Sequence, residues 1–203
     1  PWKSIGSLPF EPDIIQKCQA DPKIGRAASY GHLKIDDVIK QEKPDIYLGI
    51  EDIWGIEGFW KRRWWKKINS IIWTPADSLP LLDKHIEASQ NTDNIIVQAS
   101  FAQKALKDSG FNNTHLMPVP LDVSNFYKLD QKSKSNLRLK HNIGENDFII
   151  GFVFRNQLRK SVPNLLEGFK LFRESNPQSN AKLLLHTHWG EGWDIPRLLR
   201  EKN

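Results

Sequence analysis

Residues 148–172 read Phe148-Ile-Ile-Gly-Phe-Val-Phe-Arg155-Asn-Gln-Leu-Arg159-Lys160-Ser-Val-Pro-Asn-Leu-Leu-Glu-Gly-Phe-Lys-Leu-Phe172. The apolar run at the start, residues 148–154, has the length of a strand that is buried on both faces. Apolar residues then recur at helical spacing from Leu165 to Phe172. This pattern predicts a buried strand, a short basic loop and an amphipathic helix.

The loop between this strand and helix holds Arg155 and Lys160. Loops at the carboxyl ends of parallel strands form ligand sites in open α/β sheets. Two fixed cations beside a helix N-terminus suit a diphosphate, because the side chains and the helix end all favour negative charge. The alternative, that both are ordinary solvated loop charges, stays open.

The alternation of strands and helices continues outward from this segment. A buried strand is expected at residues 46–50, and further strands at 70–74, 94–99, 114–119 and 181–186. Helices are expected at 35–43, 79–89, 101–109 and from 195. Ser100 and Gly110 suit the caps of the third of these helices. Short connections between alternating strands and helices are typical of βαβ units, so we expect an α/β fold with parallel sheets.

Residues 121–146 interrupt this pattern, because they are polar and rich in Lys and Arg. We therefore expect three parts: a first domain over 1–120, an interdomain linker region over 121–146, and the beginning of a second domain over 147–203.

Composition narrows the function classes only slightly. The 203 residues carry a formal net charge of +5, which favours anionic partners such as phosphates, nucleotides or an acidic membrane surface but selects none of them. The single Cys18 excludes an internal disulfide and suits a reducing compartment. No apolar run approaches the roughly 18 residues of a membrane span. We expect a cytoplasmic location, with peripheral attachment to a membrane as the variant.

Residues 59–68, Phe-Trp-Lys-Arg-Arg-Trp-Trp-Lys-Lys-Ile, concentrate tryptophans and cations. This segment is open to four interpretations: an interfacial patch for anionic lipid, a surface that stacks on nucleic acid, a platform for a sugar acceptor, or a surface helix whose tryptophans pack inward.

Four segments, in this order, carry a family resemblance: Trp73-Thr-Pro75-Ala-Asp77-Ser-Leu-Pro80, Ile95-Ile-Val-Gln-Ala-Ser100-Phe101-Ala-Gln-Lys104-Ala-Leu-Lys-Asp-Ser-Gly110, Pro118-Val-Pro120-Leu-Asp122-Val-Ser-Asn-Phe126 and Phe154-Arg155-x-x-x-x-Lys160. Together they resemble the retaining glycosyltransferases of the "glycosyl transferases group 1" family, which have the GT-B fold. The last segment is similar to that family's G-R-x-x-x-x-K-G loop, with Phe154 and Ser161 in place of the glycines.

The resemblance implies two Rossmann-like domains with parallel sheets, here incomplete at both ends. The first would be the acceptor side and the second would bind the nucleotide-sugar. The reaction implied is transfer of a sugar from a nucleoside-diphosphate sugar to a carbohydrate, lipid-linked or protein acceptor, with retention of configuration and no metal. Arg155 and Lys160 would hold the diphosphate, with polar contacts from Asn156 and Gln157.

The family's paired glutamates are expected beyond the end of this chain, so the catalytic residues are not assigned here. We expect the 203 residues to form the middle of an enzyme and to be inactive alone.

Five further residues are candidates for the two sides of a cleft. Asp52 and Asp77 end predicted strands and suit acceptor hydroxyls, with turn or cap roles as the alternative. His32 is a third acceptor-side candidate, whose alternative role is structural. His186 and His188 follow a predicted strand and suit a loop of the donor cleft or a solvated loop. They lack a third ligand at metal-site spacing, so no metal is expected.

Two rival functions remain at this stage. One is a non-catalytic glycan- or membrane-surface-binding module that uses residues 59–68. The other is a nucleotide-binding domain with different chemistry, because a fold does not fix a function. We expect no nucleic-acid partner.

Overall fold

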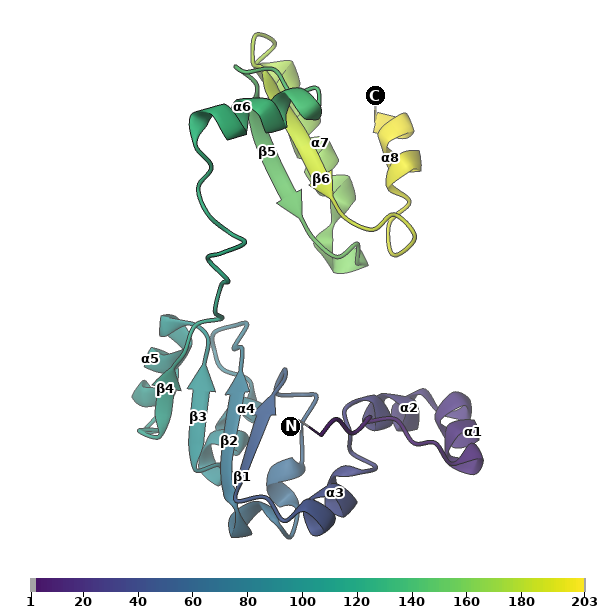
Figure 1. Cartoon of the computed structure of the whole chain (residues 1–203), viewed down its shortest axis with the longest axis vertical. Coiled ribbons are helices and arrows are strands. Elements are labelled where there is room, and N and C mark those ends of the chain that lie inside the picture. Colours follow the sequence, from purple (N-terminus) through teal and green to yellow (C-terminus); the bar gives the residue numbers. More distant parts are fainter. Residues whose placement is uncertain (1–2, 203) are drawn as a thin grey trace. The chain divides into compact units, whose positions relative to one another are not determined.

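The computed structural model describes residues 3–202, and the chain divides into two compact units (Figure 1). The first unit extends to Leu121 and the second begins at Asp122. Residues 121–146, the expected linker region, contain a helix, α6 (Gln131–Lys140).

The first unit is built on a four-stranded sheet in the order β1-β2-β3-β4, in which every neighbouring pair is parallel. Its strands are β1 (Ile46–Ile50), β2 (Asn69–Thr74), β3 (Asn94–Val97) and β4 (Thr114–Leu116). Helix α4 (Asp83–Asn91) connects β2 to β3, and α5 (Ser100–Asp108) connects β3 to β4. The predicted α/β fold with parallel sheets is confirmed.

Three helices precede the sheet, of which the sequence predicted only the third: α1 (Pro12–Ala20), α2 (Pro22–Ser29) and α3 (Ile35–Glu42). Both α1 and α2 begin with proline, which suits the first turn because its missing N–H would have no partner there. The segment that ends α2 packs on the loop after β1: the ring of Trp54 lies 5.0 Å from Tyr30 and 4.4 Å from the guanidinium of Arg26.

Two predicted helix starts were wrong. Helix α4 begins at Asp83 rather than Leu79, because the chain bends at residues 78–80 and Leu82 still has an extended backbone, with φ −66° and ψ 144°. Helix α5 begins at Ser100 itself, so Ala99 is the N-cap and the predicted serine cap is absent.

Helix α5 ends at Asp108 with Ser109 as its C-cap, one residue before the predicted end, and Gly110 follows that cap. Gly110 has a φ of +93°, and its N–H donates to the Lys107 carbonyl, while the N–H of Phe111 donates to the Leu106 carbonyl. This hydrogen-bond pair is a Schellman motif.

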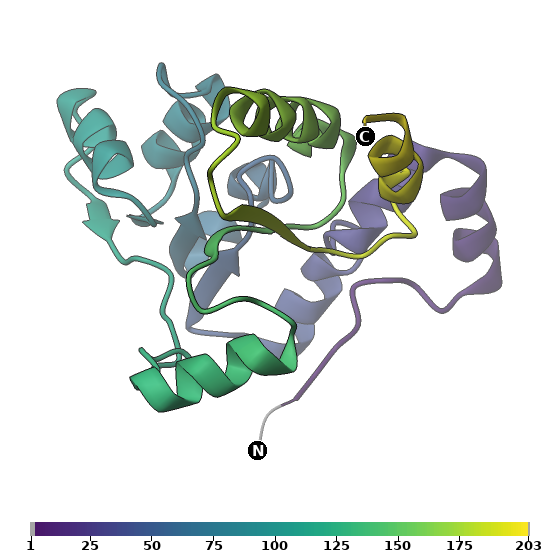
Figure 2. The same ribbon diagram turned by 90° about the horizontal axis from the view of Figure 1, so that it is seen from above.

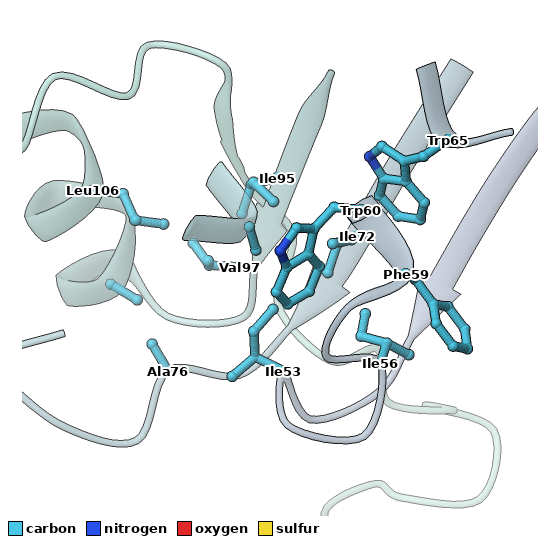
Figure 3. Close-up of a cluster of buried hydrophobic side chains, with 12 residues drawn as sticks. Ile53, Ile56, Phe59, Trp60, Trp65, Ile72, Ala76, Ile95, Val97 and Leu106 are labelled. Atoms are coloured by element: carbon cyan, nitrogen blue, oxygen red, sulfur yellow. The ribbon is translucent and has the colours of Figure 1, made fainter. Parts of the chain in front are cut away.

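Residues 59–68 are not a surface helix. They form two 3-10 turns, η1 (Phe59–Lys61) and η2 (Trp65–Lys67), separated by the extended backbone of Arg62 at φ −73° and ψ 149°. Two of the three tryptophans do pack inward: Trp60 is 4% exposed and Trp65 is fully buried, among core side chains from β2, β3 and α5 (Figure 3). Trp65 also donates from Nε1 to the Asn91 carbonyl at 2.9 Å.

Strand β1 lies at the sheet edge and is less buried than predicted. Ile46, Leu48 and Ile50 are 56%, 49% and 57% exposed. They alternate along the strand and so share one face of the sheet. The apolar run predicted the strand correctly. How far the strand is buried depends on the elements packed against it, which the sequence pattern does not show.

The second unit contains a parallel pair, β5 (Phe148–Val153) and β6 (Ala181–His186). Helix α7 (Val162–Ser175) connects them, and α8 (Ile195–Lys202) follows β6. Figure 2 shows α6 and α7 on opposite sides of this sheet. Phe148 and Val153 are 68% and 75% exposed, so the prediction of a strand buried on both faces was wrong. Within residues 3–202, β5 pairs with β6 alone, so one of its edges has no neighbouring strand.

Within residues 3–202, no helix combines the length and apolar character that crossing a bilayer requires.

Candidate functional site

Two loops of the second unit leave the carboxyl ends of its two strands: residues 154–161 follow β5, and residues 187–194 follow β6 (Figure 1). The strands are paired in register from Phe148 opposite Ala181 to Val153 opposite His186, so the two loops start side by side. The first loop carries the predicted cations, and we name the pair of loops the strand-end site.

Asn156 joins the two loops of the strand-end site. Its Nδ2 donates to the Trp193 carbonyl at 2.9 Å, and its Oδ1 accepts from the Trp193 N–H at 3.1 Å. The indole of Trp193 returns a third bond, from Nε1 to the Leu158 carbonyl at 3.1 Å. Asn156 is only 1% exposed, so its amide fixes the loops to each other.

Gly192 lies at the closest approach of the two loops. Its φ is +67°, and a Cβ at this position would come within 2.2 Å of the Asn156 carbonyl oxygen. Only glycine combines that backbone conformation with that clearance.

Arg155 projects from the fixed loop into solvent, with 69% of its side chain exposed. Its Nε donates to Oε2 of Glu191 at 3.0 Å. This hydrogen bond and the opposite charge lower the pKa of the Glu191 carboxyl and raise the pKa of the guanidinium. The guanidinium has five N–H donors, and the ion pair engages the one on Nε.

Lys160 ends the 3-10 turn η3 (Leu158–Lys160), immediately before Ser161 and α7. Among the described residues it forms no ion pair. Ser161 has a left-handed backbone, φ 49° and ψ 49°, at the position where the resembled family has glycine. The cation therefore lies beside the first turn of a 14-residue helix, whose N–H groups attract anions.

The remaining second-unit candidates lie around this site without pairing with its cations. Gln157 is the residue before η3, and its carbonyl accepts from the Lys160 N–H at 2.9 Å. His186 lines a cavity between α6 and the sheet. His188 accepts from the Gly190 N–H at 3.2 Å. Across the described part of the chain, no group of three or more His, Cys, Asp or Glu side chains is arranged to hold a metal.

The first-unit candidates follow neighbouring strands. Asp52 comes after β1 and Asp77 after β2, so both are at the carboxyl edge of the sheet. His32 donates from Nε2 to the Gly55 carbonyl at 2.8 Å, and its ring lies 4.5 Å from Phe59. Its ring is thus engaged in holding the loop after β1.

Sequence reasoning missed three residues that hold the loops carrying the candidates. In the second unit, Glu191 and Trp193 bond to the first loop of the strand-end site. In the first unit, the buried His85 donates to the Pro75 carbonyl at 3.0 Å, next to the loop that carries Asp77. The only sequence signal for Glu191 is its position between two glycines, and that position does not indicate that it pairs with Arg155.

Comparison with known proteins identifies the fold. Neither a family model nor a curated protein matches this sequence. The structure is similar to a solved structure, "Trehalose-6-phosphate from E. coli bound with UDP-2-fluoro glucose", with a TM-score of 0.55 and 16% sequence identity. The match covers 86% of this chain and 48% of that one. The fold is of the GT-B type.

That structure has the GT-B fold, so the predicted fold class is confirmed. The chain spans about half the length of that protein. At this identity the likeness shows the architecture alone.

Proposed function

We propose that this chain is part of a glycosyltransferase that moves a sugar from a nucleoside-diphosphate sugar to an acceptor with retention of configuration. One observation carries the proposal: on a GT-B-type fold, Arg155 and Lys160 stand at the carboxyl end of β5 in a loop that Asn156 fixes. Ligands of open α/β sheets bind at that edge.

The proposed chemistry needs cations at this place. The bond between the anomeric carbon and the phosphate oxygen breaks, and its electron pair stays on the phosphate. The acceptor oxygen bonds to the same carbon, and its proton passes to the departing phosphate. Arg155 and Lys160 stabilise the charge that develops on the diphosphate, and their fixed positions avoid reorganisation during the reaction.

The neighbour, which is bound to UDP-2-fluoro glucose, supports the proposed donor class. Asn156 and Gln157 shape the loop, while Asp52 and Asp77 are the proposed acceptor-side residues. We propose that the acceptor is a carbohydrate, a lipid-linked molecule or a protein. The proposal also includes membership of the group 1 family and transfer without a metal.

Binding of UDP and UDP-glucose to the 203-residue chain, measured by calorimetry, tests the donor site. Lys160→Ala should weaken UDP binding by about tenfold or more, because a charged hydrogen bond to phosphate is lost. Lys170→Ala, an exposed cation on α7, is the matched control. Equal affinity in the Lys160→Ala and unchanged chains would remove this loop from the donor site.

Retention is tested in the protein that contains this chain. Proton NMR of the product, recorded before mutarotation, reports the configuration at the anomeric carbon, and an inverted product contradicts that part of the proposal.

A further inference from the structure

A second concentration of cations lies in the first unit, in a cavity of about 620 Å³ between α3 and residues 61–67. Five cations and one carboxylate line it together with Ile39 and Trp64: Lys40, Lys61, Arg62, Arg63, Lys67 and Asp36. We name it the amino-edge groove, because α3 leads into β1 and η2 leads into β2, so both elements lie where the strands begin (Figure 1).

This position separates the groove from the proposed acceptor-side residues. Asp52 and Asp77 follow the carboxyl ends of β1 and β2, whereas the groove is at the amino ends of the same strands. A ligand in the groove would not occupy the edge at which α/β sheets place their usual ligand.

The single carboxylate of the groove is already neutralised. Asp36 accepts from Arg62 NH1 at 2.6 Å through Oδ2, and from Trp64 Nε1 at 2.7 Å through Oδ1. Lys61 is paired with Glu87 at 2.7 Å. Lys40, Arg63 and Lys67 form no ion pair with any residue that the structure describes, so three unpaired cations face one cavity.

Trp64, the aromatic residue that lines the groove, is anchored to the core of the first unit. Next to it, Trp65 is fully buried and donates from Nε1 to the Asn91 carbonyl. Trp64 packs its ring on Trp65 and Tyr47, each with a centroid distance of 5.4 Å. Asp36 holds Arg62 and Trp64 in place, which reduces the entropy lost when an anion binds to these two side chains.

We infer that the amino-edge groove binds a soluble ligand that carries phosphate groups. Multiple cations around a concave site suit several phosphate oxygens, and the volume is that of a small-molecule pocket. A lipid headgroup offers the same chemistry, but Trp60 and Trp65 are buried and cannot enter a bilayer as interfacial anchors.

The test titrates inorganic tripolyphosphate into the chain carrying Arg155→Ala, Arg159→Ala and Lys160→Ala, which removes the three cations of residues 154–161. Two-dimensional NMR follows the indole N–H of Trp64. Binding should shift that resonance, and Lys40→Gln, Arg63→Gln and Lys67→Gln together should weaken binding by about tenfold or more, on the scale of three exposed charge contacts.

The matched control is Lys17→Gln, Lys23→Gln and Lys107→Gln together, three exposed cations of the same unit that form no ion pair with a described residue. Circular dichroism of each variant verifies that the fold is kept. An equal loss of affinity in the control variant would show a diffuse charge effect and overturn the inference, as would titration without a shift at Trp64.

A vesicle arm separates the two sources of phosphate. Tripolyphosphate binding together with no sedimentation on phosphatidylglycerol vesicles supports the soluble ligand. Groove-dependent sedimentation with these vesicles, without tripolyphosphate binding, would assign the groove to a membrane surface and overturn the inference.

Discussion

Arg155 and Glu191, 36 residues apart in the sequence, form an ion pair of 3.0 Å between the loops that follow β5 and β6. The carboxylate of Glu191 thereby engages one N–H donor of the Arg155 guanidinium, which we assign to the donor diphosphate. Two anions compete for one guanidinium, so the pair sets how readily Arg155 accepts phosphate.

Removing the charge of Glu191 should strengthen donor binding. In Glu191→Gln the guanidinium loses its competing carboxylate, and we expect UDP to bind about two- to fivefold tighter, the scale of an exposed ion pair. Calorimetry measures the change, with Glu174→Gln on α7 as the charge-matched control. Unchanged or weaker UDP binding in Glu191→Gln would show that the carboxylate does not compete.

Two glycines of the second unit should respond in opposite directions to alanine. Gly192→Ala places a Cβ against the Asn156 carbonyl at a left-handed φ, so we expect the loops to separate and donor binding to fall. Gly168→Ala lies within α7 with open space around it, and should stabilise the unit by about 0.5–1 kcal/mol. Thermal unfolding measures both variants. A Gly192→Ala chain with unchanged stability and UDP affinity would contradict the role assigned to this contact.

Ser161 pays a backbone cost that glycine would avoid. Its left-handed conformation disfavours residues with a Cβ by roughly 1–2 kcal/mol, although glycine loses more entropy on folding. Ser161→Gly should therefore raise the free energy of unfolding by about 0.5–1 kcal/mol. Urea denaturation measures it, with Ser161→Ala expected near the unchanged chain. A destabilised Ser161→Gly would mean that the serine hydroxyl contributes more than its conformation costs.

Trp65 should act through the core of the first unit. Truncation to alanine leaves a cavity and removes the bond to the Asn91 carbonyl, so Trp65→Ala should cost about 3–5 kcal/mol of stability. Phe101→Ala, at a side chain 43% exposed, is the comparison and should cost much less. A Trp65→Ala chain as stable as Phe101→Ala would contradict the packing described for residues 59–68.

The strands and most helices were predictable because local patterns determine them. The apolar runs at 148–154 and 181–186 gave β5 and β6, and Gly110 gave the end of α5 through its tolerance of positive φ. Burial was less predictable. Ile46 to Ile50 read as a core strand, yet β1 has only one neighbour, and the number of neighbours is a property of the sheet.

The sequence predicted where the strand-end site lies in the fold, but not which side chains hold its two loops together. Position in a βαβ pattern located Arg155 and Lys160. Their surroundings depend on Glu191 and Trp193, which reach the first loop only because β5 and β6 pair in one particular register. Sequence spacing carries no information on that register.

The order β1-β2-β3-β4 bears on how the first unit is made on the ribosome. From β2 onward, each strand pairs with the strand synthesised just before it, so β1 alone among these four strands needs a later segment before it finds a neighbour. Such pairing keeps contacts between nearby parts of the chain, which favours fast folding. The first unit can therefore assemble strand by strand during translation, and each new βα segment covers the edge that its predecessor exposes.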